Sequence, residues 1–513
     1  MPGSLSRRSV LAGGLAAVGA MSGVLDIQPS RAQSNGLPDP FTLGVASGEP
    51  SADGVVLWTR LAPEPLAEDG MGGMPNRVVQ VEWEVADDDR FRSVVQRGTA
   101  DAAPELGHSV HVELAGLRPG AQYFYRFRAE GHLSPTGRTH TAPAPGSMGE
   151  LTMCFVSCAH YEHGFYTAYR RLAEDEPDLV LHLGDYIYEN AGSDGKPRRH
   201  VGPEIETLAN YRQRLAQYKT DPDLQAAHAI APWAPVFDDH ELDNNWANMT
   251  PERPQPNFAA RRTASFQAYY ENMPLRRASI PRGLDIQLYR RIQWGDLATF
   301  HMLDTRQYRD DQACGDGIKD CPERRAAQRT LTGSDQERWL LDGFRDSRAR
   351  WDVLGQQVFF AQLDIRPGPG ELNNMDAWDG YAANRDRVVA GWVDAKVRNP
   401  VVLTGDVHSA WAADIKQRWE DPGSPVVGAE LVATSIASGG DGSETRSETE
   451  AIRHENPHIR FFNNRRGYVR THITPERIRA DFRAVPYVTR PDAPVENKAS
   501  FIVEDRKPGL QPA

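Results

Sequence analysis

Between residues 40 and 147 the chain carries short runs in which apolar and polar residues partly alternate, a pattern typical of half-buried strands. Turns rich in Gly, Pro and Asp separate the runs. The predicted strands are GVVLWTRL (54–61), RVVQVEWEVADD (77–88), SVHVELAG (109–116) and YFYRFRAEG (123–131). The segment between the last two has the spacing of the tyrosine corner of fibronectin type III-like sandwiches, at Leu117, Pro119, Gly120 and Tyr123. A small β-sandwich domain is therefore predicted for residues 40–147.

From about residue 150 the pattern changes to apolar strand segments that alternate with amphipathic helical segments. The predicted helices are 165–177, 206–219 and 334–347, the last with Ser334 and Glu337 as a capping box. The predicted strands are 297–304, 351–363, 399–405 and 428–438, followed by a hairpin over 467–485. This order predicts a layered α/β domain with mixed sheets over residues 150–495. The polar, proline-containing residues 496–513 are expected to form a loose C-terminal tail.

The length of 513 residues is too great for one ordinary core and agrees with two domains. With 40% hydrophobic and 25% charged residues, the composition is that of a normal globular protein. The net charge of −12 argues against nonspecific nucleic-acid binding, which needs a basic surface. An acidic enzyme that acts on an anionic substrate must concentrate positive charge locally, and bound metal ions are one way to do so.

Residues 1–32 have the features of a twin-arginine export signal: Arg7-Arg8, an apolar stretch rich in Ala and Gly, and small residues at Ser30 and Ala32. We expect cleavage after Ala32 and a periplasmic or extracellular bacterial protein that meets the twin-arginine translocation machinery during export. The alternative is a membrane anchor. The apolar run over 10–25 is shorter than the roughly 20 residues of a spanning helix, which favours cleavage.

The four cysteines fall into three environments. Cys154 lies inside an apolar strand segment and is predicted to be a core residue. Cys314 and Cys321 bracket a short polar loop and are interpreted as a local disulfide, with two free thiols as the alternative. Cys158 is left over at the end of a strand, which makes it a candidate metal ligand.

Four apolar segments end in residues that can bind metals. In open α/β sheets, ligands bind at the carboxyl edge of the strands, so these ends are expected to converge. Each one alone is also compatible with an ordinary turn, since Gly-Asp is favourable turn chemistry. The segments are 151–161 with Cys158, 179–190 with Gly184-Asp185 and Tyr188, 233–246 with Asp238, Asp239 and His240, and 399–412 with Gly405-Asp406 and His408.

The order of these residues resembles that of the calcineurin-like metallophosphoesterases, which have a two-sheet α/β sandwich flanked by helices. The chain departs from their pattern in two places: Cys158 stands at the Asp of the first motif, Asp-x-His, and Tyr188 stands at the second Asp of the Gly-Asp-x-x-Asp motif. These departures are those of the alkaline phosphatase D family. The resemblance extends over the mature chain, including the segments 47–61, 303–311, 375–387 and 403–415. It implies an exported alkaline phosphatase used in phosphate acquisition.

The resemblance also implies two metal sites. Thiolate and phenolate ligands favour ferric iron, and the implied iron ligands are Cys158, Asp185, Tyr188 and His408. Asp185 would bridge to an oxygen-rich calcium site, the number of calcium ions being open. Its implied ligands are Asp239 and Asp406, with Asp238 or Asn245 as a further one. The alternatives are a packed aromatic role for Tyr188 and helix-capping or turn roles for Asp238 and Asp239.

Such a centre implies hydrolysis of phosphate monoesters, and of diesters as well, by a metal-activated water or oxo group without a phosphoenzyme. His240 is the candidate to protonate the leaving group, or else it orients a neighbouring ligand. Arg306 is the candidate phosphate donor, or else a structural ion-pair partner. His160 and His163, just after Cys158, are candidates to line the cleft, but the sequence does not fix their positions.

Other functions stay open at this point. One is a phosphodiesterase or phospholipase D-like enzyme for larger phosphodiesters, and another is a noncatalytic binding module. In the family a C-terminal segment covers the cleft, which is an alternative role for residues 496–513. The expected partners are phosphate esters.

Overall fold

The computed structural model describes residues 37–513. The export signal predicted for residues 1–32 lies outside the described residues. Within residues 37–513, no helix has the length and apolar character that crossing a membrane requires.

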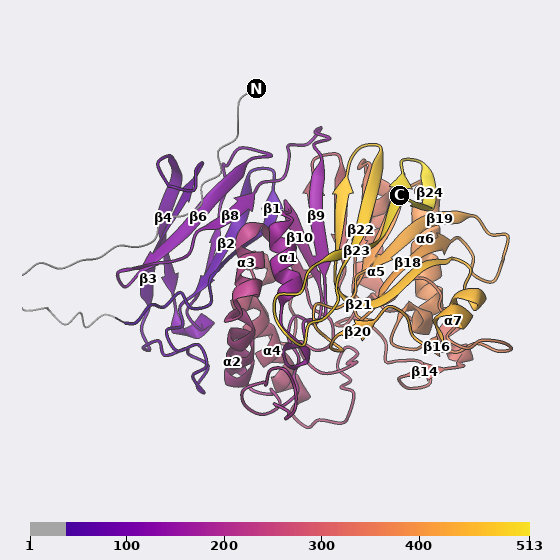
Figure 1. Ribbon diagram of the computed structural model, residues 1–513, viewed down its shortest axis with the longest axis horizontal. Coiled ribbons are helices and arrows are strands. Elements are labelled where there is room, and N and C mark those ends of the chain that lie inside the picture. Colours follow the sequence, from indigo (N-terminus) through magenta and orange to yellow (C-terminus); the bar gives the residue numbers. More distant parts are fainter. Residues whose placement is uncertain (1–36) are drawn as a thin grey trace, which may run out of the picture. The chain divides into compact units, whose positions relative to one another are not determined.

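A β-sandwich occupies the N-terminal part, as its alternating pattern predicts (Figure 1). One face is a five-stranded sheet of β4 (Val94–Ala102), β3 (Val79–Ala86), β6 (Gln122–Ala129), β7 (His132–Leu133) and β8 (Gly137–His140). The other face is β1 (Val45–Ser51), β2 (Gly54–Arg60) and β5 (Ser109–Glu113). The Tyr123 hydroxyl accepts a hydrogen bond of 2.9 Å from the backbone N–H of Arg118, which is the contact that a tyrosine corner makes.

The sandwich shares a sheet with the region that follows residue 147. Strand β1 pairs in parallel with β11 (Pro232–Val236), through Ser47 opposite Pro232 and Gly48 opposite Trp233. One face of the sandwich is therefore continuous with a sheet of the following region. Pairing satisfies the backbone groups along an edge of β1 that an independent domain would leave open.

The first large sheet has the order β5-β2-β1-β11-β10-β9-β21-β22-β23-β24. Its central strands β1, β11, β10 and β9 are parallel, so their carboxyl ends share one edge. The strands not yet given are β9 (Leu151–Val156), β10 (Leu179–Leu183), β21 (Ile459–Ile473), β22 (Arg477–Val485), β23 (Glu496–Glu504) and β24 (Lys507–Pro512).

The second sheet has the order β12-β13-β15-β17-β19-β18-β21, and β13, β15, β17 and β19 are parallel. Strand β21 joins the two sheets, because its first residues pair with β18 and its later ones with β9 and β22. The remaining strands are β12 (Arg290–Trp294), β13 (Ala298–Met302), β15 (Trp351–Gly355), β17 (Pro400–Thr404), β18 (Ala410–Lys416) and β19 (Val426–Val432).

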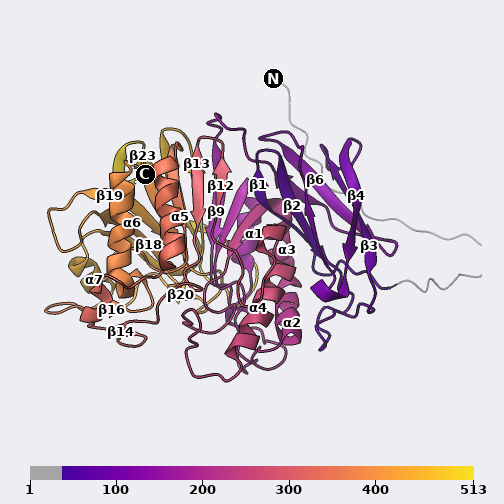
Figure 2. The ribbon, with the colours of Figure 1, turned by 180° about the vertical axis from the view of Figure 1, so that it is seen from behind.

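Helices cover the outer face of each sheet (Figures 1 and 2). The first sheet packs on α1 (Thr167–Glu174), α2 (Leu208–Lys219), α3 (Pro222–Ile230) and α4 (Phe258–Asn272). The second packs on α5 (Gly333–Asp346) and α6 (Ala382–Asp394). A third apolar cluster, with Phe155, Phe300 and Val353, lies between the sheets. The predicted fold class, a two-sheet α/β sandwich flanked by helices, is confirmed.

Short elements complete the chain. They are α7 (Thr449–Glu455), β14 (Ile318–Lys319), β16 (Asn373–Asn374), β20 (Gly442–Ser443) and the 3-10 turns Pro104–Leu106, Tyr161–His163, Arg277–Ser279, Pro322–Arg325 and Trp378–Tyr381. Cys314 and Cys321 form the predicted disulfide, and Cys154 is buried in the core as expected.

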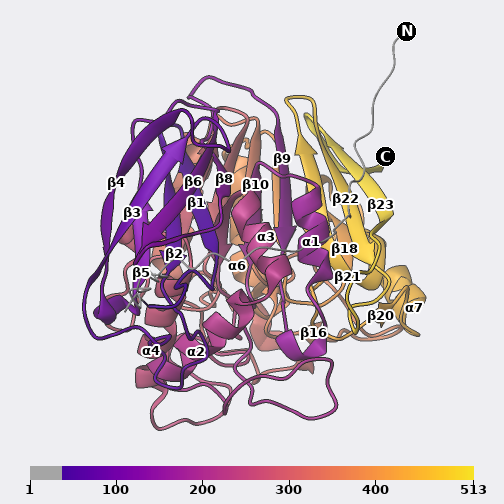
Figure 3. The ribbon, with the colours of Figure 1, turned by 60° about the vertical axis from the view of Figure 1, so that its left-hand side comes forward.

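Two local predictions are wrong. Residues 496–513 are not a loose tail, because β23 extends the first sheet beside β22 (Figure 3) and β24 pairs with β23. Phe501 and Val503 are buried in the core between the sheets, whereas Ser500, Ile502 and Glu504 are less buried, a period-two pattern that the polar composition of the segment hides. The capping box is also absent: α5 has Thr332 as its N-cap, and the Glu337 carboxylate binds Arg387 of α6 instead.

Candidate metal centre

The four predicted strand ends meet at one edge of the sandwich. Strands β9, β10 and β11 of the first sheet and β17 of the second end there, and the loop after each strand carries ligand-type side chains. Beyond these ends lie Cys158, Asp185, Tyr188, Asp238, Asp239, His240, Asp406 and His408. The stacking of two parallel-stranded sheets therefore brings residues from distant parts of the chain into one site.

The glycines before Asp185 and Asp406 permit this convergence. A Cβ atom on Gly184 would lie 2.3 Å from Cβ of Asp238, and one on Gly405 would lie 2.7 Å from Cβ of Ser157. Real Cβ atoms do not approach so closely, so only glycine lets the strand ends come together here.

The backbone of the site residues is unusual. Cys158, Asp185, Asp406 and His408 have φ values of 61°, 57°, 63° and 53°, and Asn245 has 48°. Left-handed φ is uncommon for residues other than glycine and costs free energy. Several such residues around one point indicate that the fold holds their side chains in place for a chemical purpose.

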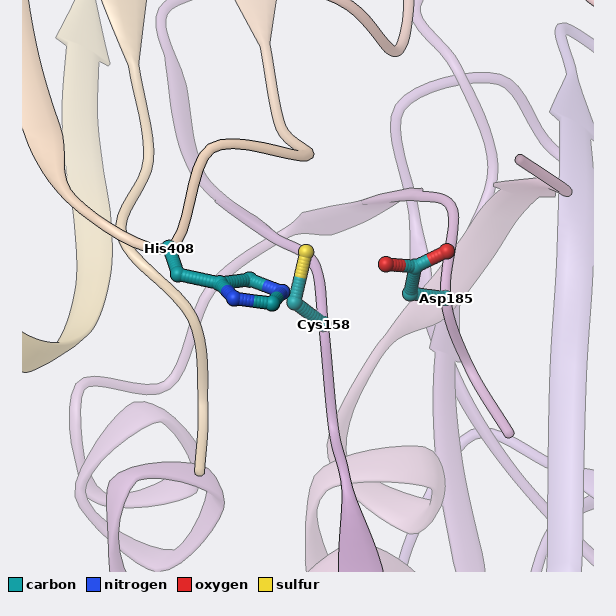
Figure 4. A group of neighbouring side chains, drawn as sticks. All are labelled: Cys158, Asp185 and His408. Carbon is teal, nitrogen blue, oxygen red and sulfur yellow. The ribbon is translucent and has the colours of Figure 1, made fainter. Parts of the chain in front are cut away.

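The first donor group combines sulfur, nitrogen and oxygen atoms. Ligand atoms of Cys158, Asp185 and His408 lie within 4.8 Å of one another (Figure 4). The Tyr188 hydroxyl joins them, at 2.9 Å from Oδ2 of Asp185 and 3.0 Å from Nε2 of His408. Oγ of Ser438 donates to the same hydroxyl at 2.8 Å. Tyr188 therefore points its hydroxyl into the group and is not merely a packed aromatic ring.

The second donor group contains only carboxylates. Carboxylate oxygens of Asp238, Asp239 and Asp406 lie within 4.8 Å of one another. Oδ2 of Asp238 and Oδ1 of Asp239 are buried, and within residues 37–513 they have no hydrogen-bond partner. Asp185, Asp239 and His240 form a further set within the same distance, so Asp185 contacts both groups.

These donor atoms fit bound cations. Burial raises the pKa values of Cys158 and Tyr188 well above their usual ranges, and the charge of Asp185 raises both further. Burial and neighbouring aspartates likewise raise the pKa values of Asp185 and Asp406. So many buried acids are unfavourable as anions unless positive charge compensates them. A site with orphaned carboxylate oxygens and this donor set is suited to metal ions.

His240 lies between the donor groups and a carboxylate that the sequence analysis missed. Nδ1 of His240 is 2.8 Å from Oε2 of Glu189, and the other Glu189 oxygen accepts from the Asn244 backbone N–H at 3.2 Å. Burial lowers the pKa of His240, but the charges of Glu189, Asp239 and Asp185 outweigh burial and raise it well above its usual value. His240 is therefore oriented through Nδ1, which leaves Nε2 for another partner.

Arg306 has the structural role that the sequence analysis gave as the alternative. The guanidinium is fully buried and donates to Asp238 at 2.6 Å and to both oxygens of Asp376 at 2.8 Å. All three of its nitrogens are thus committed to carboxylates, and the assignment of Arg306 as a phosphate donor does not agree with the geometry. Burial raises the pKa of Asp238 to about 6, although Arg306 opposes that rise.

Glu241 directly follows Asp238-Asp239-His240 in the chain, and the sequence analysis assigns it no role. Its carboxylate accepts the backbone N–H groups of Asp185, Tyr186 and Asp238, at 3.1, 2.6 and 2.9 Å. Burial raises its pKa to about 8, although these hydrogen bonds oppose the rise. Glu241 therefore fastens the loop after β10 to the loop after β11. Its position directly after Asp-Asp-His is the only local signal that could have indicated this.

The remaining predicted residues lie around the donor groups. The backbone N–H of Asn245 donates to Oδ2 of Asp239 at 2.8 Å, and its side-chain amide donates to Asp316 of the disulfide loop at 2.6 Å. The His160 ring stacks on His163 with centroids 3.8 Å apart and lies 4.3 Å from the Tyr188 ring. Both histidines therefore line the side of the site formed by Tyr188.

Comparisons with known proteins agree with this arrangement. Residues 153–482 match the PhoD-like phosphatase family, and residues 27–143 match the N-terminal domain of PhoD-like phosphatases. The chain is 51% identical to alkaline phosphatase D of Bacillus subtilis (strain 168) over 481 residues, which are 92% of this chain and 82% of that protein. The chain belongs to the PhoD-like phosphatase family. It is a phosphatase, and its donor groups are candidate metal-binding groups of that enzyme.

Solved structures extend the comparison. This chain matches a structure of PhoD with a TM-score of 0.91 and 50% sequence identity. The match covers 93% of this chain and 92% of that chain. The purple acid phosphatase PPD1 from yellow lupin (Lupinus luteus) seeds has a TM-score of 0.54 at 12% identity, covering 90% of this chain and 73% of that chain. At this identity the second likeness concerns the fold alone.

Proposed function

We propose that the protein is an exported alkaline phosphatase that hydrolyses phosphate monoesters and diesters at an iron–calcium centre. The observation that carries this proposal is the pair of donor groups that share Asp185. One is mixed sulfur, nitrogen and oxygen, and the other is carboxylate only. Two different donor sets side by side are suited to two different cations.

The chemistry of each group supports a specific metal. Cys158, Tyr188, His408 and Asp185 offer a thiolate, a phenolate and an imidazole, a set that favours ferric iron over magnesium. Asp239, Asp406 and Asp238 offer hard oxygen ligands, which suit calcium. When bound, such cations neutralise charge on a phosphate group and acidify the attacking water.

Side chains of the protein itself would supply the proton donor, balance buried charge and position the ligand loops. Glu189 holds the His240 ring through Nδ1, so that Nε2 can give a proton to the departing alkoxide. Arg306 pairs with Asp238 and Asp376 and keeps these carboxylates ionised in a buried place. Glu241 holds the backbone of the two ligand loops together.

Export belongs to the same proposal. The twin-arginine pattern in residues 1–32 supports passage through the twin-arginine machinery to the periplasm or the cell exterior. A protein that carries a redox-active metal gains from this route, because it can fold and load the metal before it crosses the membrane.

The test is hydrolysis of p-nitrophenyl phosphate and bis-p-nitrophenyl phosphate by the exported protein, with and without chelator, together with metal analysis. We expect both substrates to be cleaved, both activities to be lost on chelation, and iron and calcium to be present. Full activity after all metal has been removed would overturn the proposal. Activity on the diester alone would replace it with a phosphodiesterase of the phospholipase D-like type.

A further inference from the structure

A cavity of about 470 Å³ opens beside the donor groups. Asp406 and His408 line it, so it is continuous with the candidate metal centre. Its volume falls in the range of about 300–1,000 Å³ that small-molecule sites occupy. The cavity is therefore large enough for an organic group attached to a phosphate held at Asp406 and His408.

The walls of this cavity are mainly apolar and come from four parts of the chain. Trp411 of β18 makes edge-to-face contacts with Phe359, in the loop after β15, and with Phe462 of β21, at centroid distances of 5.7 and 4.5 Å. Ile452 of α7 and Leu363 add aliphatic surface. Aromatic walls of this kind offer broad contact to a flat ring or a hydrocarbon chain.

Several polar side chains of the lining are occupied within the protein. The Trp411 indole N–H donates to Oγ of Ser409 at 2.9 Å. Asp379 pairs with Arg385 at 2.7 Å, and the Asn374 side chain accepts from the Asp376 backbone N–H at 3.0 Å. Beside these groups and the aromatic walls, a polyol would lose hydrogen bonds to water and regain few, whereas an apolar group would lose none.

Arg446 stands at the side of the cavity formed by Phe462. Its guanidinium carbon lies 5.6 Å from the centre of the Phe462 ring, and Nη2 donates to Oδ1 of Asn464 at 2.9 Å. The guanidinium thus contacts the π face of a wall residue and holds that ring in place.

We infer that this cavity binds the ester group of the substrate, and that the preferred substrates are phosphate esters of apolar, above all aromatic, alcohols. This inference rests on the proposed phosphatase function and adds a substrate class to it. The phosphate lies at the end with Asp406 and His408, and the alcohol part lies between Phe359, Trp411 and Phe462. Burial of a ring in such a pocket favours the aromatic ester by about tenfold or more over an ester of a polar alcohol.

The experiment compares two primary-alcohol esters, 3-phenylpropyl phosphate and glycerol 3-phosphate, with the metal-loaded enzyme. Their leaving groups are both primary alkoxides, so a difference in kcat/KM reports mainly on binding of the ester group. Wild type should have the higher kcat/KM on 3-phenylpropyl phosphate. Phe462→Ala should lower that value by about tenfold and leave glycerol 3-phosphate within about twofold. Leu133→Ala, at an exposed position on β7, is the matched control and should change neither.

A second variant keeps the test decisive if Phe462→Ala does not fold. Ile452→Asn changes a partly exposed residue of the same lining and should reduce kcat/KM on 3-phenylpropyl phosphate alone. Equal kcat/KM for both esters in wild type, or equal losses on both in the variants, would overturn the inference.

A binding measurement separates failure of this inference from failure of the proposed function. If wild type hydrolyses neither ester, the phosphatase proposal fails. Calorimetry with 3-phenylpropylphosphonate and methylphosphonate then tests the cavity by itself. Tighter binding of the aromatic phosphonate that is lost in Ile452→Asn supports the cavity, and equal affinities overturn it.

Discussion

The two donor groups share Asp185 and one edge of the sandwich, yet they differ in how their charge is balanced. Within residues 37–513, no arginine or lysine forms an ion pair with the group of Cys158, Asp185, Tyr188 and His408, and burial together with the charge of Asp185 makes its thiol and phenol poor acids. In the group of Asp238, Asp239 and Asp406, the buried Arg306 pairs with Asp238 at 2.6 Å and with Asp239 at 3.7 Å. A group without an ion-paired arginine depends more on its metal, whereas a group with one can release its metal at lower cost.

In the proposed iron–calcium centre, this difference would make one cation permanent and the other exchangeable. Thiolate and phenolate ligation is strong and specific, and carboxylate ligation of a hard divalent ion is more readily reversed.

The largest effect is expected for Asp185→Asn, because Asp185 contacts both donor groups. The variant should lose more activity than the roughly 10–100-fold that follows mutation of an outer partner of a ligand. Both metals should fall in content by elemental analysis. Asp194→Asn, at an exposed loop position, is the control and should keep both. Loss of only one metal would mean that Asp185 belongs to a single group.

The second-largest effect is expected from removal of calcium, which should distinguish the two donor groups. A calcium chelator should abolish activity before iron leaves, and Asp406→Ala should behave like the chelated enzyme while it retains iron. Added calcium should restore wild type, and magnesium should restore less because it demands octahedral geometry at shorter distances. Simultaneous loss of iron and activity on mild chelation, or full recovery with zinc alone, would remove the proposed contrast.

Tyr188→Phe tests whether Tyr188 is a ligand in the first donor group, beside Cys158, Asp185 and His408. Its hydroxyl contacts Asp185, His408 and Ser438, so its removal deletes one ligand and leaves the others. The visible charge-transfer band expected from a phenolate–iron bond should disappear, with a circular dichroism spectrum like that of wild type. Activity should fall less than in Asp406→Ala. A colourless wild type with full iron content would contradict phenolate ligation.

The smallest effect is expected for Glu189→Gln, which leaves both donor groups intact. We expect a loss of about tenfold in kcat. Glu189 helps to raise the pKa of His240, so its neutralisation lowers that pKa. A proton donor works only below its own pKa. The alkaline limb of the kcat–pH profile should therefore move to lower pH. An unchanged profile would mean that His240 is not the proton donor.

Several parts of this protein could be predicted from local pattern. The alternation over residues 54–61 and 123–131 indicates strands, and the Gly-Asp pairs at 184–185 and 405–406 indicate strand ends. The tyrosine corner follows from four residues within a short segment. These features depend on interactions between residues close in sequence, so composition and spacing suffice to predict them.

Other parts depend on contacts that no local pattern carries. His240 meets Glu189 across 51 positions, and Arg306 meets Asp376 across 70. The polar composition of residues 496–513 suggests a tail, and only the structure shows that β23 pairs with β22. Likewise, no local pattern predicts that β1 of the sandwich pairs with β11 of the following region.

The sequence by itself determined which side chains could bind metals, where strands end, and that a Gly-Asp pair stands at two of those ends. The tertiary structure decided which of these groups meet, that Arg306 serves the carboxylates rather than the substrate, and that an aromatic cavity adjoins Asp406 and His408. The physical reason lies in the stacking of two sheets joined through β21. That packing sets distances between residues far apart in the chain, and burial there controls which charges need a partner.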